Sequence, residues 1–262
     1  MERGEYQVMY ASEEGHWWYW GLRDLVLSYV AAGTAGRASA LVLDAGCGTG
    51  KHLEALAGLR VRAVGLELAT EAFRFLRDRG LDNVARASIC RIPFPDGSFD
   101  LVLSTDVVCC VEPPGDRAAL RELARVLQPG GTLLLNLPAY EALRSRHDAA
   151  VHVRQRFTRG SLVKLLGAAG LRVRTATYRN TILFPVAAAV RMVRRGRGHE
   201  HGPAPTSDLA LPPGLINGLL KVPLFLENRW IRAGGRLPFG LSVFCVATRS
   251  PSGTMTDVGW FL

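Results

Sequence analysis

The stretch from Leu41 to Gly50, LVLDAGCGTG, constrains the fold of this 262-residue chain more than any other part of it. An apolar run ending at Asp44 predicts a buried strand, and glycines at every second position from Gly46 predict a tight turn into a helix. Glycine permits positive φ angles and lets a ligand approach the backbone. The stretch therefore predicts a strand–turn–helix unit with a ligand at its turn.

The glycine spacing argues against a nicotinamide dinucleotide site. The fingerprint of such a site, G-x-G-x-x-G, needs a third glycine where Lys51 stands when Gly46 and Gly48 are taken as the first two. The pattern here is instead D-x-G-x-G-x-G. A second acid, Glu67, ends the next predicted strand, where a carboxylate suits the two hydroxyl groups of a ribose.

Short apolar runs alternate with helical patterns, which predicts a doubly wound α/β fold with a seven-stranded, mostly parallel sheet. The expected strands are 40–44, 61–67, 84–88, 99–104, 132–137, 171–178 and 241–249. The expected helices between them are 52–58, 70–79, 116–127 and 161–169, the last with a cap at Ser161 and a stop at Gly170.

Four parts of the chain are expected. Residues 1–36 are rich in aromatic residues and predict a helical lid, with the alternative that the tryptophans only pack in the core. Residues 37–180 with 239–250 form the Rossmann-like domain. Residues 181–238 predict a helical cap inserted before the last strand, with helices at 184–195 and 214–231 around a polar loop at 196–208. Residues 251–262 form a tail.

Composition limits the classes of protein and of partner. Hydrophobic residues make up 48% of the chain, yet no apolar run reaches the roughly 18 residues that span a bilayer, and the N-terminus does not resemble a secretory signal. We therefore expect a cytoplasmic protein. The five cysteines form no CxxC pair, which argues against a disulfide framework and a zinc site, and no cluster of acids suggests another metal.

The formal net charge of +9 raises the question of an anionic partner. The basic residues are spread along the chain, and few aromatic residues interleave with the compact cluster formed by Arg191, Arg194, Arg195 and Arg197. This favours a solvated face over a nucleic-acid groove, so we expect no nucleic-acid partner. Peripheral contact with a membrane, and a monomeric or homodimeric state, both stay open.

The glycine turn and two later stretches together resemble the class I S-adenosylmethionine-dependent methyltransferases. The resemblance is to the small-molecule group of methyltransferase type 11 in particular. The later stretches are RIPFPDGSFDLVLSTDVV at residues 91–108 and RELARVLQPGGTLLL at residues 121–135. The resemblance covers about residues 38–178 and resumes at the last strand. It implies S-adenosylmethionine as the cofactor, with its methionine part in the glycine turn and its ribose at Glu67.

Carried over residue by residue, the resemblance implies a cofactor site made of Asp44, Ala45, Gly46, Cys47, Gly48, Gly50, Glu67, Leu68, Ser88, Ile89, Thr105 and Arg23. Two positions depart from the family pattern. Ser88 stands where an aspartate commonly binds the adenine amino group, and Cys109-Cys110 replace a Glu-His pair. The cysteines are interpreted as small buried residues rather than as a catalytic thiolate pair.

Methyl transfer from a sulfonium is an in-line displacement that needs a base only when the acceptor must lose a proton. The candidate bases are His147 and His152, where Asp148 could orient one of them, and His16. The alternative is that these histidines are loop or capping residues. The expected acceptor is small and largely apolar, such as a natural-product, quinone or lipid-like intermediate. Its expected contacts are Tyr10, Trp17, Trp18, Cys110 and Tyr140.

Two other classes of protein compete with a small-molecule methyltransferase. A nucleic-acid amino-methyltransferase is disfavoured, because residues 104–107 read Ser-Thr-Asp-Val where such enzymes carry Asn/Asp-Pro-Pro-Tyr/Phe. A protein of this fold that binds the cofactor but catalyses another reaction, such as a cyclisation, or that serves as a partner protein, stays open as the alternative.

Overall fold

A seven-stranded sheet with the strand order β3-β2-β1-β4-β5-β7-β6 forms the centre of the molecule. The computed structural model describes residues 1–37, 39–185, 188–189 and 212–250. Neighbouring strands from β3 to β5 are parallel, whereas β7 runs antiparallel to both β5 and β6. The predicted doubly wound, mostly parallel sheet is thus confirmed. The strands are β1 Leu41–Ala45, β2 Arg62–Glu67, β3 Val84–Arg86, β4 Phe99–Thr105, β5 Leu127–Pro138, β6 Leu171–Arg179 and β7 Ser242–Arg249.

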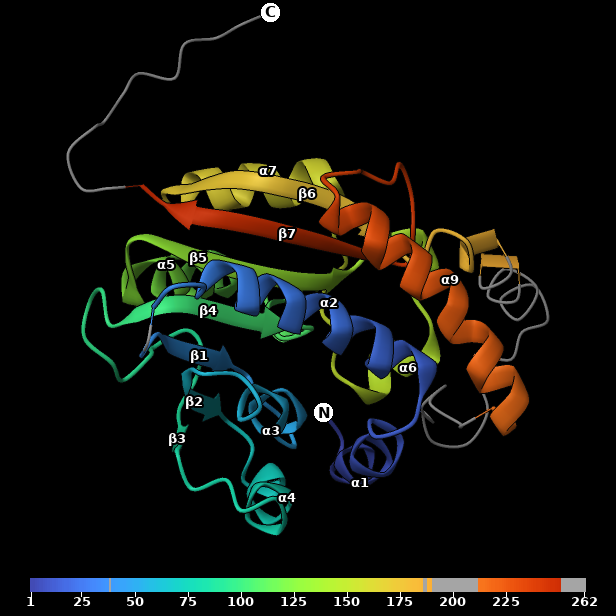
Figure 1. Cartoon of the computed structure of the whole chain (residues 1–262), viewed down its shortest axis with the longest axis horizontal. Coiled ribbons are helices and arrows are strands. Elements are labelled where there is room, and N and C mark those ends of the chain that lie inside the picture. Colours follow the sequence, from blue (N-terminus) through green and yellow to red (C-terminus); the bar gives the residue numbers. More distant parts are fainter. Residues whose placement is uncertain (38, 186–187, 190–211, 251–262) are drawn as a thin grey trace, which may run out of the picture.

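Helices cover both faces of this sheet (Figure 1). One layer is built on α2, α3 and α9, whose apolar side chains share a cluster with β1, β4 and β7. The other layer is built on α5 and α7. The helices are α1 Arg3–Ser12, α2 Trp17–Gly33, α3 Lys51–Leu56, α4 Phe73–Asp78, α5 Gly115–Val126, α6 Arg146–Ala150, α7 Arg159–Ala168 and α9 Gly214–Arg232.

Several boundaries differ from the expected ones for local reasons. The helix near residue 161 begins at Arg159, and its cap is Thr158, whose hydroxyl accepts a hydrogen bond from the Ser161 backbone N at 3.1 Å. The segment 70–79 divides into a 3₁₀ turn, Thr70–Ala72, and α4. Strand β5 begins at Leu127, earlier than expected, because this residue already pairs with Phe99 of β4.

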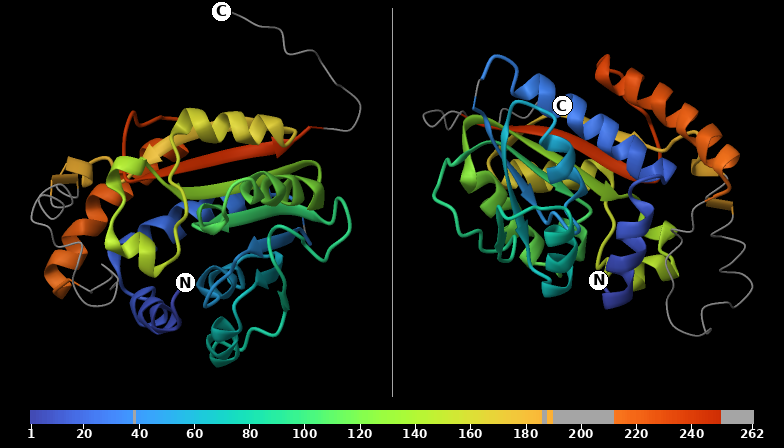
Figure 2. Two further views of the ribbon diagram at one scale, coloured as in Figure 1. Left: turned by 180° about the vertical axis from the view of Figure 1, so that it is seen from behind. Right: turned by 60° about the horizontal axis from the view of Figure 1, so that its bottom comes forward.

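The N-terminal segment and the insert meet on one face of the sheet, where α2 and α9 lie side by side (Figures 1 and 2). A Cβ atom at Gly21 of α2 would lie 2.5 Å from Leu224 Cδ1 of α9, so a glycine is required for this approach. The Asn228 side chain of α9 donates to the Gly21 carbonyl at 2.8 Å. The expected loop 196–208, the tail and the arginine cluster lie outside the described residues.

No helix in the described part of the chain combines the length and the apolar character needed to cross a membrane.

Candidate active site

A cavity of about 860 Å³ opens at the carboxyl ends of β1, β2 and β4. The glycine turn and Glu67 line one side of it, α1 and α2 line another, and the loop after β5 lines a third. Leu183 and Leu220 of the insert also contribute. In open α/β sheets this is the edge at which ligands bind, because the strand order reverses direction there.

The turn after β1 requires glycine. Gly46 and Gly48 have φ angles of 91° and 55°, which L side chains rarely adopt. A Cβ atom at Gly46 would also lie 2.3 Å from Val107 Cγ2, and one at Gly48 would lie 3.0 Å from Met9 Cε of α1. The turn is therefore a narrow cradle between β4 and α1 that larger residues would fill.

The Glu67 carboxylate is held in place by the backbone. Its Oε2 atom accepts a hydrogen bond from the Gly48 N at 2.8 Å, and its Oε1 atom accepts from the N atoms of Leu68 and Ala69, both at 2.9 Å. The side chain is buried yet lines the cavity. Each carboxylate oxygen has further acceptor capacity, so Glu67 can receive the hydroxyl groups of a ribose without moving.

Asp44 lies behind the turn with no partner among the described residues. Neither carboxyl oxygen has a hydrogen bond, and only 1% of the residue is exposed. Burial, and then the charge of Glu67, raises the pKa of Asp44 to about 8. Asp44 does not line the cavity, so it lies behind the glycine cradle rather than at the surface that a ligand would contact.

Most of the predicted site residues line the cavity. For the cofactor these are Arg23, Gly46, Cys47, Gly48, Glu67, Leu68, Ser88, Ile89 and Thr105, and for the acceptor and its proton they are His16, Trp17, Trp18, Cys110, His147 and His152. Asp44, Ala45 and Gly50 are not among the lining residues.

Two predicted acceptor contacts lie elsewhere. Tyr10 stacks on Phe75 with ring centroids 4.8 Å apart, and Tyr140 stacks on Tyr178 at 5.1 Å. Neither tyrosine is among the residues that line the cavity.

His16 also has a structural role. Its Nδ1 atom accepts a hydrogen bond from the Trp18 backbone N at 3.2 Å, which caps the start of α2. Burial lowers the pKa of His16 below its usual value, so the ring is neutral at physiological pH. Arg23, expected at the methionine carboxylate, donates to the Glu13 carbonyl at 2.9 Å while it lines the cavity.

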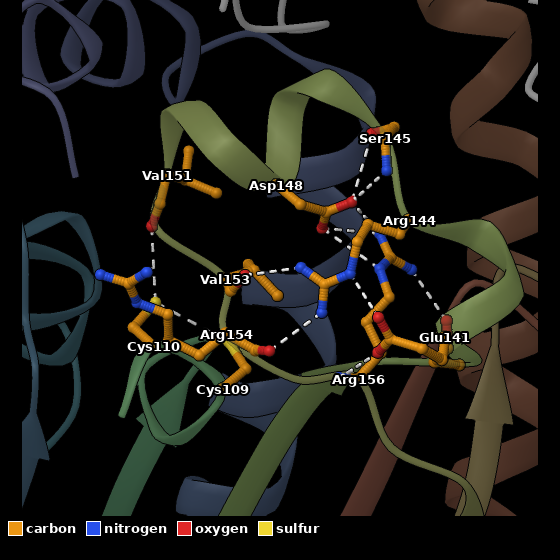
Figure 3. A network of polar contacts seen from close by, with 11 residues as sticks. Cys109, Cys110, Glu141, Arg144, Ser145, Asp148, Val151, Val153, Arg154 and Arg156 are labelled. Atoms are coloured by element: carbon orange, nitrogen blue, oxygen red, sulfur yellow. Dashed lines mark hydrogen bonds and ion pairs between the residues drawn. The ribbon is translucent and has the colours of Figure 1, made fainter. Parts of the chain in front are cut away.

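The loop after β5 is fixed by a buried ion pair (Figure 3). Asp148 and Arg156 are bound at 2.8 Å with side chains 2% and 4% exposed, and Asp148 also accepts from the Ser145 N at 2.6 Å. Arg156 donates in turn to the Ala139 carbonyl at 2.8 Å. The loop thereby brings His147 and His152 to the cavity wall, and His152 contacts the Glu2 carboxylate at 2.9 Å.

Asp106, which was not among the predicted site residues, is a strong candidate for chemistry. It follows β4 with a φ of 58°, lines the cavity and accepts from the Asn136 side chain at 3.1 and 3.2 Å. Asn136 accepts in turn from the buried Arg179 at 3.3 Å. Burial raises the pKa of Asp106 to about 7. The available signal was an acid directly after a predicted parallel strand, where side chains reach the site.

His52 is a second residue that sequence reasoning missed. It lines the cavity from α3, and its Nε2 atom is buried without a hydrogen-bond partner among the described residues. Burial, and then the charge of Arg23, lowers the pKa of His52 to about 4. No sequence signal distinguished it from an ordinary residue at the start of a helix.

Sequence comparison relates the central part of the chain to known methyltransferases. Residues 43–135 match the family model of a methyltransferase domain. A probable tRNA methyltransferase 9B of Homo sapiens is 35% identical over 111 residues, which are 41% of this chain and 23% of that protein. A probable S-adenosylmethionine-dependent methyltransferase of Mycolicibacterium smegmatis is 29% identical over 65% of each chain. A ubiquinone biosynthesis O-methyltransferase of Xanthomonas oryzae is 34% identical over 44% of this chain and 49% of that protein.

Two solved structures share the fold. A complex of the Haloferax volcanii Trm112 methyltransferase activator with a methyltransferase aligns with a TM-score of 0.60 and 20% identity over 96% of each chain. The [4+2]-cyclase SpnF aligns with a TM-score of 0.55 and 21% identity over 87% of this chain and 80% of that one. The chain matches less than two thirds of the length of each of the three curated relatives.

The sheet order, the glycine cradle and the fixed acid after β2 define a doubly wound α/β protein with a cavity at its strand ends. Residues 43–135 form a methyltransferase domain, and the relatives together with the shared fold support a class I S-adenosylmethionine-dependent methyltransferase.

Proposed function

We propose that the protein transfers the methyl group of S-adenosylmethionine to a small, largely apolar organic acceptor. The observation that carries this proposal is the single cavity of about 860 Å³, which joins the glycine cradle and Glu67 to Trp17, Trp18 and Leu220. A cofactor in the cradle and an acceptor against the indole rings would share one cavity, as methyl transfer requires.

Different residues of the cavity would bind different parts of the cofactor. Glu67 would hold the ribose hydroxyl groups, the turn from Gly46 to Gly48 would hold the methionine part, and Ser88 with the Ile89 backbone would hold the adenine edge. Bound S-adenosylmethionine supplies an electrophilic methyl group on a sulfonium. The chain itself supplies alignment and exclusion of water, because α1 places Tyr6 and Met9 over the cradle.

An acceptor that carries a hydroxyl group must lose a proton, and the cavity offers several groups to receive it. Asp106 faces the cavity with a pKa raised to about 7, which suits a base near neutral pH. His16 has a lowered pKa, and its Nδ1 atom is engaged in the cap. His147 and His152 remain candidates from the loop after β5. Asp106 is our first choice, because the chain from Arg179 through Asn136 orients its carboxylate.

The experiment is a measurement of S-adenosylhomocysteine release from S-adenosylmethionine with a panel of acceptors. The panel contains phenolic quinone precursors, fatty acids and unmodified tRNA. We expect release with an apolar phenol or lipid-like acceptor and no release with tRNA. Release with tRNA alone would refute the small-molecule proposal. Consumption of an acceptor without release would favour the alternative of a non-methylating reaction such as cyclisation, the activity named for SpnF.

A further inference from the structure

Helix α9 has one buried face and one exposed apolar face. Toward the molecule it presents Leu224, Ile231 and the polar pair Glu227 and Asn228, all buried. Away from it runs a stripe of five side chains, each more than half exposed, at a spacing of three or four residues: Leu215, Leu219, Val222, Leu226 and Trp230. The stripe is about 22 Å long at the rise of an α-helix. A contiguous apolar surface of this length on a folded domain marks a contact site.

Most charges around this α9 stripe are positive. The helix has a single acid, Glu227, which is buried and accepts from the backbone N atoms of Asn180 and Ile182 at 2.7 and 2.9 Å. Arg229 and Arg236 are exposed at the C-terminal end of the stripe, whereas Arg232 pairs with Asp24 at 3.4 Å. The whole chain carries a formal net charge of +9. The surface therefore combines an apolar stripe, a terminal tryptophan and flanking cations.

The α9 stripe borders the cavity. Leu220 lines the cavity and adjoins Leu219 of the stripe on the same helical turn. Asn217, also on α9, accepts from the Trp17 backbone N and donates to the Gly15 carbonyl, both at 2.9 Å. These contacts fix α9 against the start of α2, beside two tryptophans of the cavity wall.

We propose that α9 docks on the surface of an anionic lipid bilayer, with the stripe in the acyl boundary and the arginines among the headgroups. An amphipathic helix with an aromatic residue and arginines at its polar margin has the chemistry of an interfacial helix that does not span the membrane. Docking itself does not depend on methyl transfer. Only its consequence, direct passage of an apolar acceptor from the bilayer into the cavity, rests on the proposed function.

Vesicle flotation of the full chain tests the docking. The probes are vesicles of phosphatidylcholine alone and of phosphatidylcholine mixed with phosphatidylglycerol. We expect the protein to float with the anionic vesicles and to be released by salt. Leu219→Asp/Leu226→Asp should lower the partition coefficient about tenfold or more, because two apolar anchors are lost. Val163→Asp, at a residue 36% exposed on α7, is the matched control and should float like the unaltered chain.

Two further measurements separate the contribution of the arginines to docking from that of the apolar stripe. Arg229→Glu/Arg236→Glu should abolish the preference for anionic vesicles. Tryptophan emission should shift to shorter wavelength on addition of vesicles, and Trp230→Phe should remove most of that shift.

Equal flotation of the Leu219→Asp/Leu226→Asp variant, or no flotation of the unaltered chain, would overturn the docking. A dimer in light scattering that this variant dissociates, with no flotation, would instead assign the stripe to a second copy. Binding of S-adenosylhomocysteine and methyl transfer, measured without vesicles, check the fold of each variant. Intact transfer beside absent flotation rejects the docking alone, whereas absent transfer by a folded, cofactor-binding chain rejects the proposed function.

Discussion

At the scale of single residues, Glu67 is in place before any ligand arrives, since three backbone N–H groups already hold its carboxylate. Loss of this charge-assisted acceptor should cost about 1–3 kcal/mol of cofactor binding. We predict that Glu67→Ala weakens S-adenosylhomocysteine binding accordingly in calorimetry. Glu71→Ala is the control, because Glu71 pairs with the exposed Arg3 and should leave affinity unchanged. If Glu67→Ala and Glu71→Ala bound S-adenosylhomocysteine equally well, Glu67 would not be a cofactor-binding residue.

A substitution at Gly48 tests whether the cofactor binds in the glycine cradle. A Cβ atom there would lie 3.0 Å from Met9 Cε, and the φ angle of 55° is unfavourable for any side chain. We predict that Gly48→Leu abolishes detectable cofactor binding while the thermal transition stays cooperative. Gly80→Leu is a control of similar backbone cost, because Gly80 has a φ of 69° with nothing within 4 Å of its Cβ position. Binding by Gly48→Leu equal to that of the control would contradict the cradle.

The raised pKa of Asp106 predicts that both methyl transfer and stability depend on pH. Burial raises its pKa to about 7, so the carboxyl group is protonated below that pH and available as a base above it. We predict that kcat/KM rises through about pH 7 and that Asp106→Asn abolishes this limb. The same raised pKa means that the folded state binds the proton more tightly than the unfolded state. The contribution of Asp106 to stability is therefore fully present below about pH 4 and is lost as pH rises through about 7. If kcat/KM of Asp106→Asn still rose through about pH 7, a histidine rather than Asp106 would be assigned as the base.

At the scale of elements, α1 and the turn after it are tied to the cofactor end of the sheet by a buried ion pair. Glu13 accepts from Arg79 at 2.6 Å and from the Thr49 hydroxyl at 2.5 Å, and the Glu13 and Arg79 side chains are 5% and 7% exposed. Removal of one partner leaves a buried charge unpaired, which costs about 3–5 kcal/mol. We predict that Arg79→Met lowers the Tm and weakens cofactor binding, because α1 covers the cradle.

The double variant Glu13→Gln/Arg79→Met should recover part of the stability that Arg79→Met loses, because it removes both charges. Arg3→Ala, in an exposed ion pair, should change the Tm little. If Arg79→Met lowered the Tm without any change in affinity, the ion pair would support the fold but not the cover over the cradle.

The order of the strands was predictable because each strand has a local signal, an apolar run next to a turn, whereas α6 falls in a segment that the sequence indicates as a loop. The start of β5 was not predictable, since Leu127 joins the strand only through pairing with β4. The hydrogen-bonded chain behind Asp106 was also beyond sequence reasoning, since Asn136 reaches Asp106 from β5 and Arg179 reaches Asn136 from β6. The apolar pattern of α9 was predictable, but the face that stays exposed depends on how the helix packs against α2.

At the scale of the whole molecule, the described residues contain no group of three His, Cys, Asp or Glu side chains placed to hold a metal ion. The absence of a metal requirement stays a prediction. We expect methyl transfer to be unchanged after treatment with EDTA and dialysis, because alignment and a protein base suffice for the displacement. Loss of activity that magnesium restores would show a metal site that the described residues do not form.

The position of β7 has a consequence for synthesis on the ribosome. Although it comes last in the sequence, β7 lies between β5 and β6 in the sheet. Until its residues leave the exit tunnel, the nascent chain has two unpaired strand edges and an incomplete core. Folding of the cofactor half can begin early, but closure of the sheet must wait for the final strand. During that interval the free edges of β5 and β6 are open to pairing with other chains.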